Sequence, residues 1–115
     1  MAVRGVGTDL VRVARVRQLM AKHPARFIGR ILTDEERAAD RPITAATLAK
    51  RWAAKEAVAK ALGTGIGATY GFHDIVLTHD AAGAPVVRVA GVQGRIWLSV
   101  ADDGPYATAT AVWDV

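Results

Sequence analysis

The sequence of 115 residues contains no cysteine, which excludes disulfide bonds, thiol nucleophiles and thiolate metal sites. It also lacks any apolar run that approaches the ~20 residues needed to cross a bilayer. The first four residues, Met1 to Arg4, lack the apolar stretch of a signal peptide. We therefore expect a cytoplasmic protein that does not enter a membrane.

Internal repeats, low-complexity tracts and long linkers are absent as well, while 51% of the residues are hydrophobic. This predicts a single domain over residues 1–115 with one core. A domain this short buries a smaller share of its surface than a larger one, so burial shared within an oligomer is a reasonable expectation.

Lys and Arg number 15 against 11 acidic residues, a formal charge of +4. An acidic partner is favoured: a nucleic acid, an anionic cofactor or an acidic protein.

The N-terminal region predicts a strand followed by a helix. Residues 3–6 form a short apolar strand that runs into Gly7-Thr8-Asp9. Apolar residues then recur at helical spacing over residues 10–22, and Pro24 ends this helix because the residue before proline leaves helical geometry. Residues 26–32 form a short, partly apolar segment.

Two capping signals predict two further helices. Thr33 and Glu36 match the capping box that opens a short helix, which stops near residue 42. Thr44 caps the longest helix, over residues 45–62, and Gly63 is well placed to end it.

The C-terminal half changes to an alternating pattern, which predicts strands. Residues 75–78 and 86–90 form one hairpin, and residues 95–101 and 106–113 form a second. The order of strand, helices and strands indicates an α+β fold, with helices packed on a mainly antiparallel sheet.

Three local features are open to two interpretations each. Asp9 follows a strand and is either the N-cap of the next helix or a ligand that projects into a cleft. Glu56 and Lys60 are four residues apart on one helix face, which fits a solvated ion pair as well as a site. The glycine-rich residues 63–67 form either a plain turn or a loop whose amides approach a phosphate.

Together these features resemble a known family. The stretches are Gly5-Val6-Gly7-Thr8-Asp9-Leu10, then Arg26-Phe27-Ile28-Gly29-Arg30-Ile31-Leu32-Thr33, then the long block from Arg51 to Gly67, followed by Asp74-Ile75. In order and in spacing they resemble the holo-acyl-carrier-protein synthase family of 4′-phosphopantetheinyl transferases. The resemblance runs nearly end to end, and the Arg51–Gly67 block is its most specific part.

The resemblance implies an activity and a cofactor. These enzymes move the 4′-phosphopantetheine arm of coenzyme A onto a serine of an apo carrier protein and release adenosine 3′,5′-bisphosphate. Asp9 and Glu56 occupy the two metal-ligand positions, for a Mg²⁺ ion completed by phosphate oxygens and water. Lys60 matches a lysine beside the phosphates, and Glu56 is the best candidate for the general base.

The resemblance also implies binding residues for both substrates. Arg51 matches an arginine near the nucleotide phosphates. The cofactor positions are completed by two loops, namely Gly63 and Gly65 in one and Gly83 and Pro85 in the other. Arg15 and Arg26 match arginines that dock the acidic helix of the carrier protein, and members of this small type form homotrimers with shared active sites.

Two positions depart from the family pattern at the nucleotide end. Trp97 and Asp102 replace the two histidines of the penultimate strand. Tryptophan can stack on adenine but cannot donate to a phosphate in the same way, so weaker coenzyme A binding is expected.

Two rival functions are compatible with the composition. A basic RNA-binding module would explain the charge, but the sequence has neither an RNP-like aromatic pattern nor a Gly-x-x-Gly loop in a suitable context. A homologue that binds coenzyme A or a carrier protein without turnover would keep the fold and lose the activity.

Overall fold

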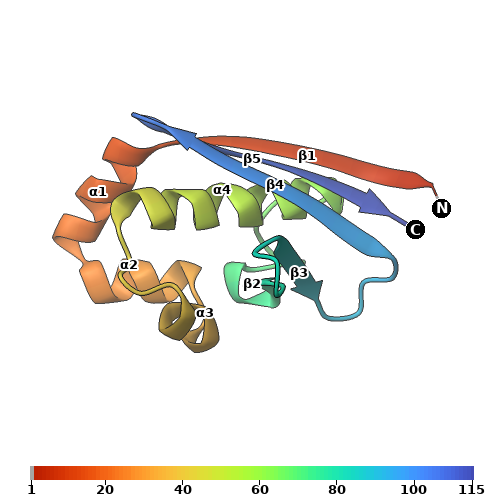
Figure 1. The fold of residues 1–115 in the computed structure, drawn as a ribbon, viewed down its shortest axis with the longest axis horizontal. Coiled ribbons are helices and arrows are strands. Elements are labelled where there is room, and N and C mark those ends of the chain that lie inside the picture. Colours follow the sequence, from red (N-terminus) through yellow and green to blue (C-terminus); the bar gives the residue numbers. More distant parts are fainter. Residues whose placement is uncertain (1) are drawn as a thin grey trace.

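The computed structural model describes residues 2–115, and its main sheet has three antiparallel strands. Strand β5 (Tyr106–Asp114) lies in the middle, between β1 (Val3–Arg12) and β4 (Arg95–Asp103). The long helix α4 (Ala45–Ala61) crosses one face of this sheet. Figure 1 shows α4 between the sheet and a lower layer made of the other helices and a hairpin.

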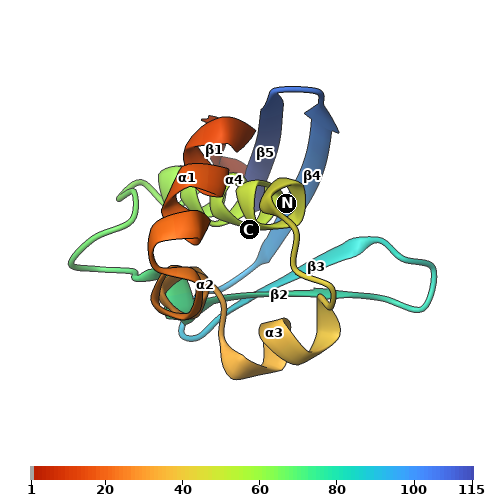
Figure 2. The same cartoon turned by 90° about the vertical axis from the view of Figure 1, so that its left-hand side faces the viewer.

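The lower layer contains the short elements. Helices α1 (Val13–Lys22), α2 (Pro24–Ile31) and α3 (Asp34–Ala39) follow β1, and the short 3₁₀ helix η1 (Phe72–Asp74) leads into the hairpin of β2 (Ile75–His79) and β3 (Pro85–Val89). Figure 2 shows that this hairpin projects away from α1 and α2. The predicted α+β fold with helices on a mainly antiparallel sheet is confirmed.

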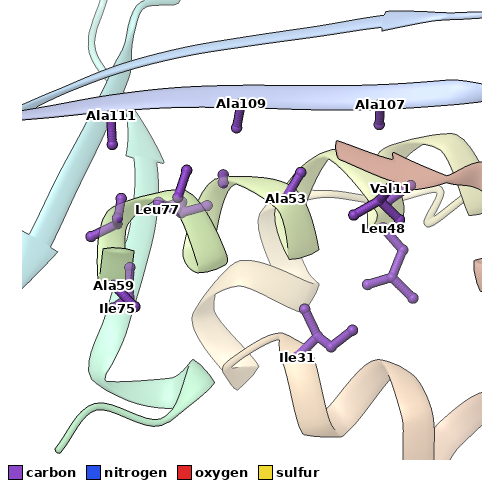
Figure 3. Packing of buried hydrophobic residues seen from close by; sticks show 14 of the residues in the cluster. Val11, Ile31, Leu48, Ala53, Ala59, Ile75, Leu77, Ala107, Ala109 and Ala111 are labelled. Atoms are coloured by element: carbon purple, nitrogen blue, oxygen red, sulfur yellow. The ribbon is translucent and has the colours of Figure 1, made fainter. Parts of the chain in front are cut away.

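Small side chains let α4 lie close to the sheet. The inner face of β5 carries Ala107, Ala109 and Ala111, each at most 1% exposed. These alanines point towards the alanine-rich face of α4, as Figure 3 shows. On the far side of α4, the larger apolar side chains of Ile31, Ile75 and the helix residue Leu48 fill the space to the lower layer.

Two glycines bring β1 even closer to α4. A Cβ atom placed on Gly7 would lie 1.9 Å from the carbonyl oxygen of Ala57, and one on Gly5 would lie 1.8 Å from that of Ala61. No side chain fits there, so the backbones of β1 and α4 are in direct contact. The glycines of the Gly-Val-Gly opening are therefore required by packing.

The boundary between the first strand and helix differs from the prediction. β1 continues through Asp9, Leu10 and Val11 to Arg12, and α1 starts at Val13. Because β5 offers backbone partners along this whole length, with Arg12 opposite Tyr106, the strand extends where a helical period was expected. Asp9 is therefore not a helix N-cap; the N-cap of α1 is Arg12, which makes no side-chain capping bond.

The other predicted boundaries agree closely with the structure. Thr33 and Glu36 form the capping box of α3, and the Thr44 side chain accepts a hydrogen bond from the amide of Thr47 at the start of α4. Pro24 does end α1, but it also opens α2, so residues 26–32 are mostly helical. No helix of residues 2–115 is long and apolar enough to span a membrane.

Candidate active site

Asp9 lies on the α4-facing side of β1. Gly5, Gly7, Asp9 and Val11 alternate on this side, and the Asp9 side chain is 19% exposed. Because Gly7 lets the strand contact the Ala57 backbone, the next inward side chain projects onto the adjacent turn of α4. The first carboxylate of the site is therefore fixed by a rigid element on each side.

Lys60 of α4 pairs with this carboxylate. Its Nζ donates to Asp9 Oδ1 at 3.1 Å and to the carbonyl oxygen of Thr8 at 3.0 Å. The lysine side chain is 48% exposed, so its charge stands at the surface of the protein. Among residues 2–115 no ion pair joins Lys60 to Glu56, so the local interpretation of a Glu56–Lys60 surface pair is wrong.

Glu56 stands one turn before Lys60 on the same helix. It lines an open pocket of about 370 Å³ whose other walls are mainly apolar. The pocket is lined by Arg15, Leu19, Phe27, Arg30, Ile31, Trp52, Glu56, Ile66 and Phe72. The structure thus pairs Asp9 of β1 with Lys60, and carries Glu56 one turn before Lys60 in the C-terminal half of α4.

The side chains at this point suit a magnesium ion. The part of the chain that the structure describes has no cluster of three or more His, Asp or Glu side chains that could hold a metal alone. Asp9 and Glu56 offer two carboxylates without nitrogen or sulfur ligands. This donor set fits Mg²⁺, which is usually bound by one or two carboxylates together with water and substrate phosphates.

Arg51 makes a different contact from the predicted one. Its guanidinium binds Asp40, at the end of α3, through Nε at 2.8 Å and through a terminal nitrogen at 3.1 Å. This bidentate pair anchors α3 to α4. Contact of Arg51 with nucleotide phosphates stays a prediction.

The glycine-rich loop begins directly after α4. Gly63 and Gly65 have φ angles of +89° and +70°, which end the helix and turn the chain. The amides of Thr64 and Gly65 both donate to the carbonyl of Ala59. The loop therefore lies beside the helix end that carries Lys60, but three of its amides, those of Gly63, Thr64 and Gly65, are already bonded to helix carbonyls.

The predicted nucleotide end lies in another part of the molecule. Gly83 and Pro85 belong to the β2–β3 turn, where Asp80 accepts hydrogen bonds from the amides of Ala82 and Ala84. Pro85 and Trp97 line one hollow of about 190 Å³, which none of Asp9, Glu56 and Lys60 lines. Within one chain these residues are not brought to the carboxylates.

The two departures from the family pattern have defined contacts. The guanidinium of Arg95 stacks on the ring of Trp97 at 3.6 Å from its centroid, and Trp97 is 45% exposed. Asp102 lies 3.5 Å from the ammonium of Lys50 on α4. An aromatic face with a cation on it replaces the expected imidazole.

The predicted docking arginines are both exposed on neighbouring helices. Arg15 of α1 lies with its guanidinium 5.1 Å from the ring of Trp52, and Phe27 packs edge-on against the same ring. Arg26 of α2 borders a smaller hollow together with Leu19 and Phe27. The structure places both on the α1–α2 surface, where Arg15 lines the Glu56 pocket and Arg26 borders the neighbouring hollow.

Sequence reasoning missed a buried ion pair next to Glu56. Lys55 and Glu36 are both fully buried, with Lys55 Nζ 2.6 Å from Glu36 Oε1. Burial lowers the pKa of the Lys55 ammonium, while the hydrogen bond and charge of Glu36 act in the opposite direction. The signal that could have found it is helical spacing, because Lys55 lies seven residues after Leu48 and four before Ala59, on the buried stripe.

Comparisons with known proteins identify the family. The model of the 4′-phosphopantetheinyl transferase superfamily matches residues 5–111. The chain belongs to this superfamily. A holo-[acyl-carrier-protein] synthase from Azoarcus sp. (strain BH72) is 42% identical, over 96% of each chain.

Solved structures of holo-[acyl-carrier-protein] synthases have the same fold. The holo-[acyl-carrier-protein] synthase of Neisseria meningitidis superposes with a TM-score of 0.89 at 36% identity, covering 99% of this chain and 100% of that one. A synthase from Bacillus anthracis in complex with CoA (3′,5′-ADP) gives a TM-score of 0.87 at 32% identity, over 96% of each chain. The predicted family, fold and class of enzyme, a transferase, are confirmed.

Proposed function

We propose that this chain transfers the 4′-phosphopantetheine arm of coenzyme A to a serine of an apo acyl carrier protein, with Asp9, Glu56 and Lys60 as its catalytic residues. The observation that carries the assignment of residues is the 3.1 Å ion pair between Asp9 and Lys60. It ties the β1 carboxylate to Lys60, one turn after Glu56 on α4, in a chain of the phosphopantetheinyl transferase superfamily.

Asp9 and Glu56 would hold Mg²⁺, and a set of residues beyond these two carboxylates would hold coenzyme A. When bound, the ion would polarise the phosphoryl group and neutralise charge on the diphosphate. Lys60 contributes a positive charge beside the same phosphates and stabilises the leaving phosphate. Arg51, Gly63 and Gly65 complete this end of the cofactor site in the proposal.

Glu56 is the proposed general base. The serine hydroxyl oxygen forms a bond to the phosphorus that carries pantetheine, and the bond from that phosphorus to the bridging oxygen breaks. Adenosine 3′,5′-bisphosphate leaves, and the serine proton passes to the Glu56 carboxylate, directly or through water.

The carrier protein would approach over the α1–α2 surface. Arg15 and Arg26 are exposed there, Arg15 on the pocket that Glu56 lines and Arg26 on the hollow next to it. Carrier proteins are acidic, so these charges would speed the encounter and make it sensitive to salt. The cytoplasmic location stays a prediction. We expect no nucleic acid among the partners.

A homotrimer would complete the nucleotide end of the site. None of the described helices covers the outer face of the sheet, where Val6 and Leu10 are 62% and 64% exposed. A neighbouring copy on this face could bring Trp97 or the Gly83–Pro85 turn to the carboxylates of the first. Such sharing would explain why one chain alone leaves these groups apart.

The decisive test combines the protein with apo carrier protein, coenzyme A and Mg²⁺, and measures the mass of the carrier. We expect a gain equal to one phosphopantetheine arm, and no gain when a chelator is present. Carrier binding without a mass gain would instead support the non-catalytic homologue.

Replacing Glu56 by glutamine tests the residue assignment. Glu56→Gln keeps the shape of the side chain but removes the base and one metal ligand, so we expect turnover to be lost. Circular dichroism should match the wild type, because Glu56 is only partly buried and lines an open pocket at the edge of the core. An active Glu56→Gln variant would overturn the proposed base while leaving the assignment of transferase activity in place.

A further inference from the structure

Lys55 is the centre of a buried hydrogen-bond network next to the proposed base. Its Nζ donates to Glu36 Oε1 at 2.6 Å, to the carbonyl of Ile31 at 2.7 Å and to that of Phe72 at 2.9 Å. An ammonium has three donors, so every one of them is used. The side chain is completely shielded from solvent.

Glu36 extends this network to two further elements. Its Oε1 accepts from the amide of Thr33 at 2.8 Å, and its Oε2 accepts from the amide of Leu77 at 2.8 Å. The Lys55–Glu36 pair therefore joins α4 to the end of α2, the start of α3, the start of η1 and strand β2. One ion pair fixes the relative positions of five elements.

Two of the groups that Lys55 holds belong to the Glu56 pocket. Ile31, at the end of α2, and Phe72, at the start of η1, both line that pocket together with Glu56. Lys55 binds the carbonyl of each, from the position directly before Glu56 on α4. The walls of the pocket are thus tied to the same helix turn as the proposed base.

Stability alone does not explain a charge at this position. Removing an ammonium and a carboxylate from water costs more than their attraction regains in many proteins, and apolar residues of similar volume often serve as well. An apolar side chain, however, could not bind two carbonyls and a carboxylate at once. What only lysine supplies here is the fixed geometry of Ile31, Phe72 and Glu36.

We propose that Lys55, paired with Glu36, is a positioning residue of the transferase: it fixes Ile31 and Phe72 as walls of the pocket beside Glu56, and so sets how well a substrate is seated there. The proposal rests on the proposed role of Glu56. Displacement of reacting groups by about 1 Å can cost roughly 10²-fold in rate, so loosened walls should affect turnover without any loss of the carboxylates.

The test is the double variant Lys55→Met/Glu36→Gln. Lys55→Met alone would leave a buried unpaired carboxylate and unfold the protein, whereas the added Glu36→Gln change removes that charge and still fits the capping box of α3. The matched control is Lys50→Met on the same helix, because Lys50 pairs with Asp102 at the surface, away from the pocket.

Two measurements separate positioning from simple stabilisation. In the double variant we expect faster hydrogen exchange of the amides of residues 66–74, and a kcat/KM lower by roughly tenfold or more, with KM raised for at least one substrate. Lys50→Met should leave the exchange rates and the kinetic constants unchanged. A purely structural role would lower the apparent kcat with the folded fraction and would not move KM, so unchanged KM or unchanged exchange overturns the proposal.

A second variant tests the role of the pocket wall if the double variant does not fold. Phe72→Ala removes one wall but keeps the carbonyl that Lys55 binds, and we expect it to raise the same KM. An unchanged KM in Phe72→Ala would overturn the role of this wall. The exchange measurement needs no catalysis, so its failure is distinct from a failure of Glu56→Gln or of the mass assay.

Discussion

Single residues of the site are held by backbone contacts more than by side-chain networks. Asp9 reaches α4 because Gly7, two residues earlier, has no side chain to keep β1 away from the helix. Lys60 then closes the gap between the two elements with its bond to Asp9. A carboxylate and an ammonium at this distance partly neutralise one another until an anionic substrate or a cation competes for them.

Removing the charge of Lys60 tests its role at the phosphates. We expect Lys60→Met to lower kcat by about 10²–10³-fold, the usual loss when a group that stabilises developing charge is removed. Lys60 is half exposed, so the fold should persist. The measurement is the rate of carrier modification, with Lys50→Met as the control, and wild-type turnover in Lys60→Met would contradict the assignment.

At the scale of elements, β1 and α4 are in direct backbone contact. Both glycines of β1 face carbonyl oxygens of α4, and the alanines of β5 face the same helix. The spacing between sheet and helix is therefore set by backbone atoms, and the side chains carried on both elements are placed with little freedom.

Adding one methyl group at Gly7 should separate these elements. Gly7→Ala would place its Cβ 1.9 Å from the Ala57 oxygen, so β1 must move, and we expect a loss of at least about 1–3 kcal/mol in the free energy of unfolding. Gly67→Ala is the control, because no atom lies within 4 Å of its Cβ. Thermal unfolding of the two variants at one protein concentration measures their stabilities. Equal midpoints in Gly7→Ala and Gly67→Ala would show that the contact of Gly7 with α4 does not control stability.

The elements that sequence patterns predicted well are those with local chemical signals. Three features depend only on neighbouring residues, namely the capping box at Thr33, the cap at Thr44 and the alternation of the hairpins. They could therefore be predicted from the sequence alone. The extension of β1 through Asp9 depends on β5, which lies about a hundred residues later, and no local pattern records it.

The candidate site was predictable for a different reason. Asp9, Glu56 and Lys60 were found through the family resemblance, since each had an ordinary local interpretation. The partners of Arg51 and Lys55 were not found, because Asp40 and Glu36 lie on another helix and their pairing is a product of tertiary packing.

At the scale of the whole molecule, one broad face of the sheet stands open. In register across β1, β5 and β4, the outward residues Val6, Val112 and Trp97 form one row, and Leu10, Thr108 and Ala101 form another. Exposed apolar side chains in such rows favour contact with another protein surface. This agrees with the proposed homotrimer, in which this face would be covered.

A charge on this face should separate the subunits. We expect Leu10→Lys to lower the molar mass in light scattering to that of a monomer, because the lysine would have to be buried without a partner. Ala38→Lys, on exposed α3, is the control and should keep the mass of the wild type. If Leu10→Lys also retains that mass, the open face is not the interface.

The burial of α4 between two layers also bears on the speed of the enzyme. A helix packed against the sheet on one side and the lower layer on the other cannot swing outward to admit coenzyme A or to release product. Entry and exit therefore fall to the loop of residues 63–71 and to exposed side chains around the pocket. Exposed loops move in nanoseconds to microseconds, so access to the pocket does not have to wait for a movement of α4 itself.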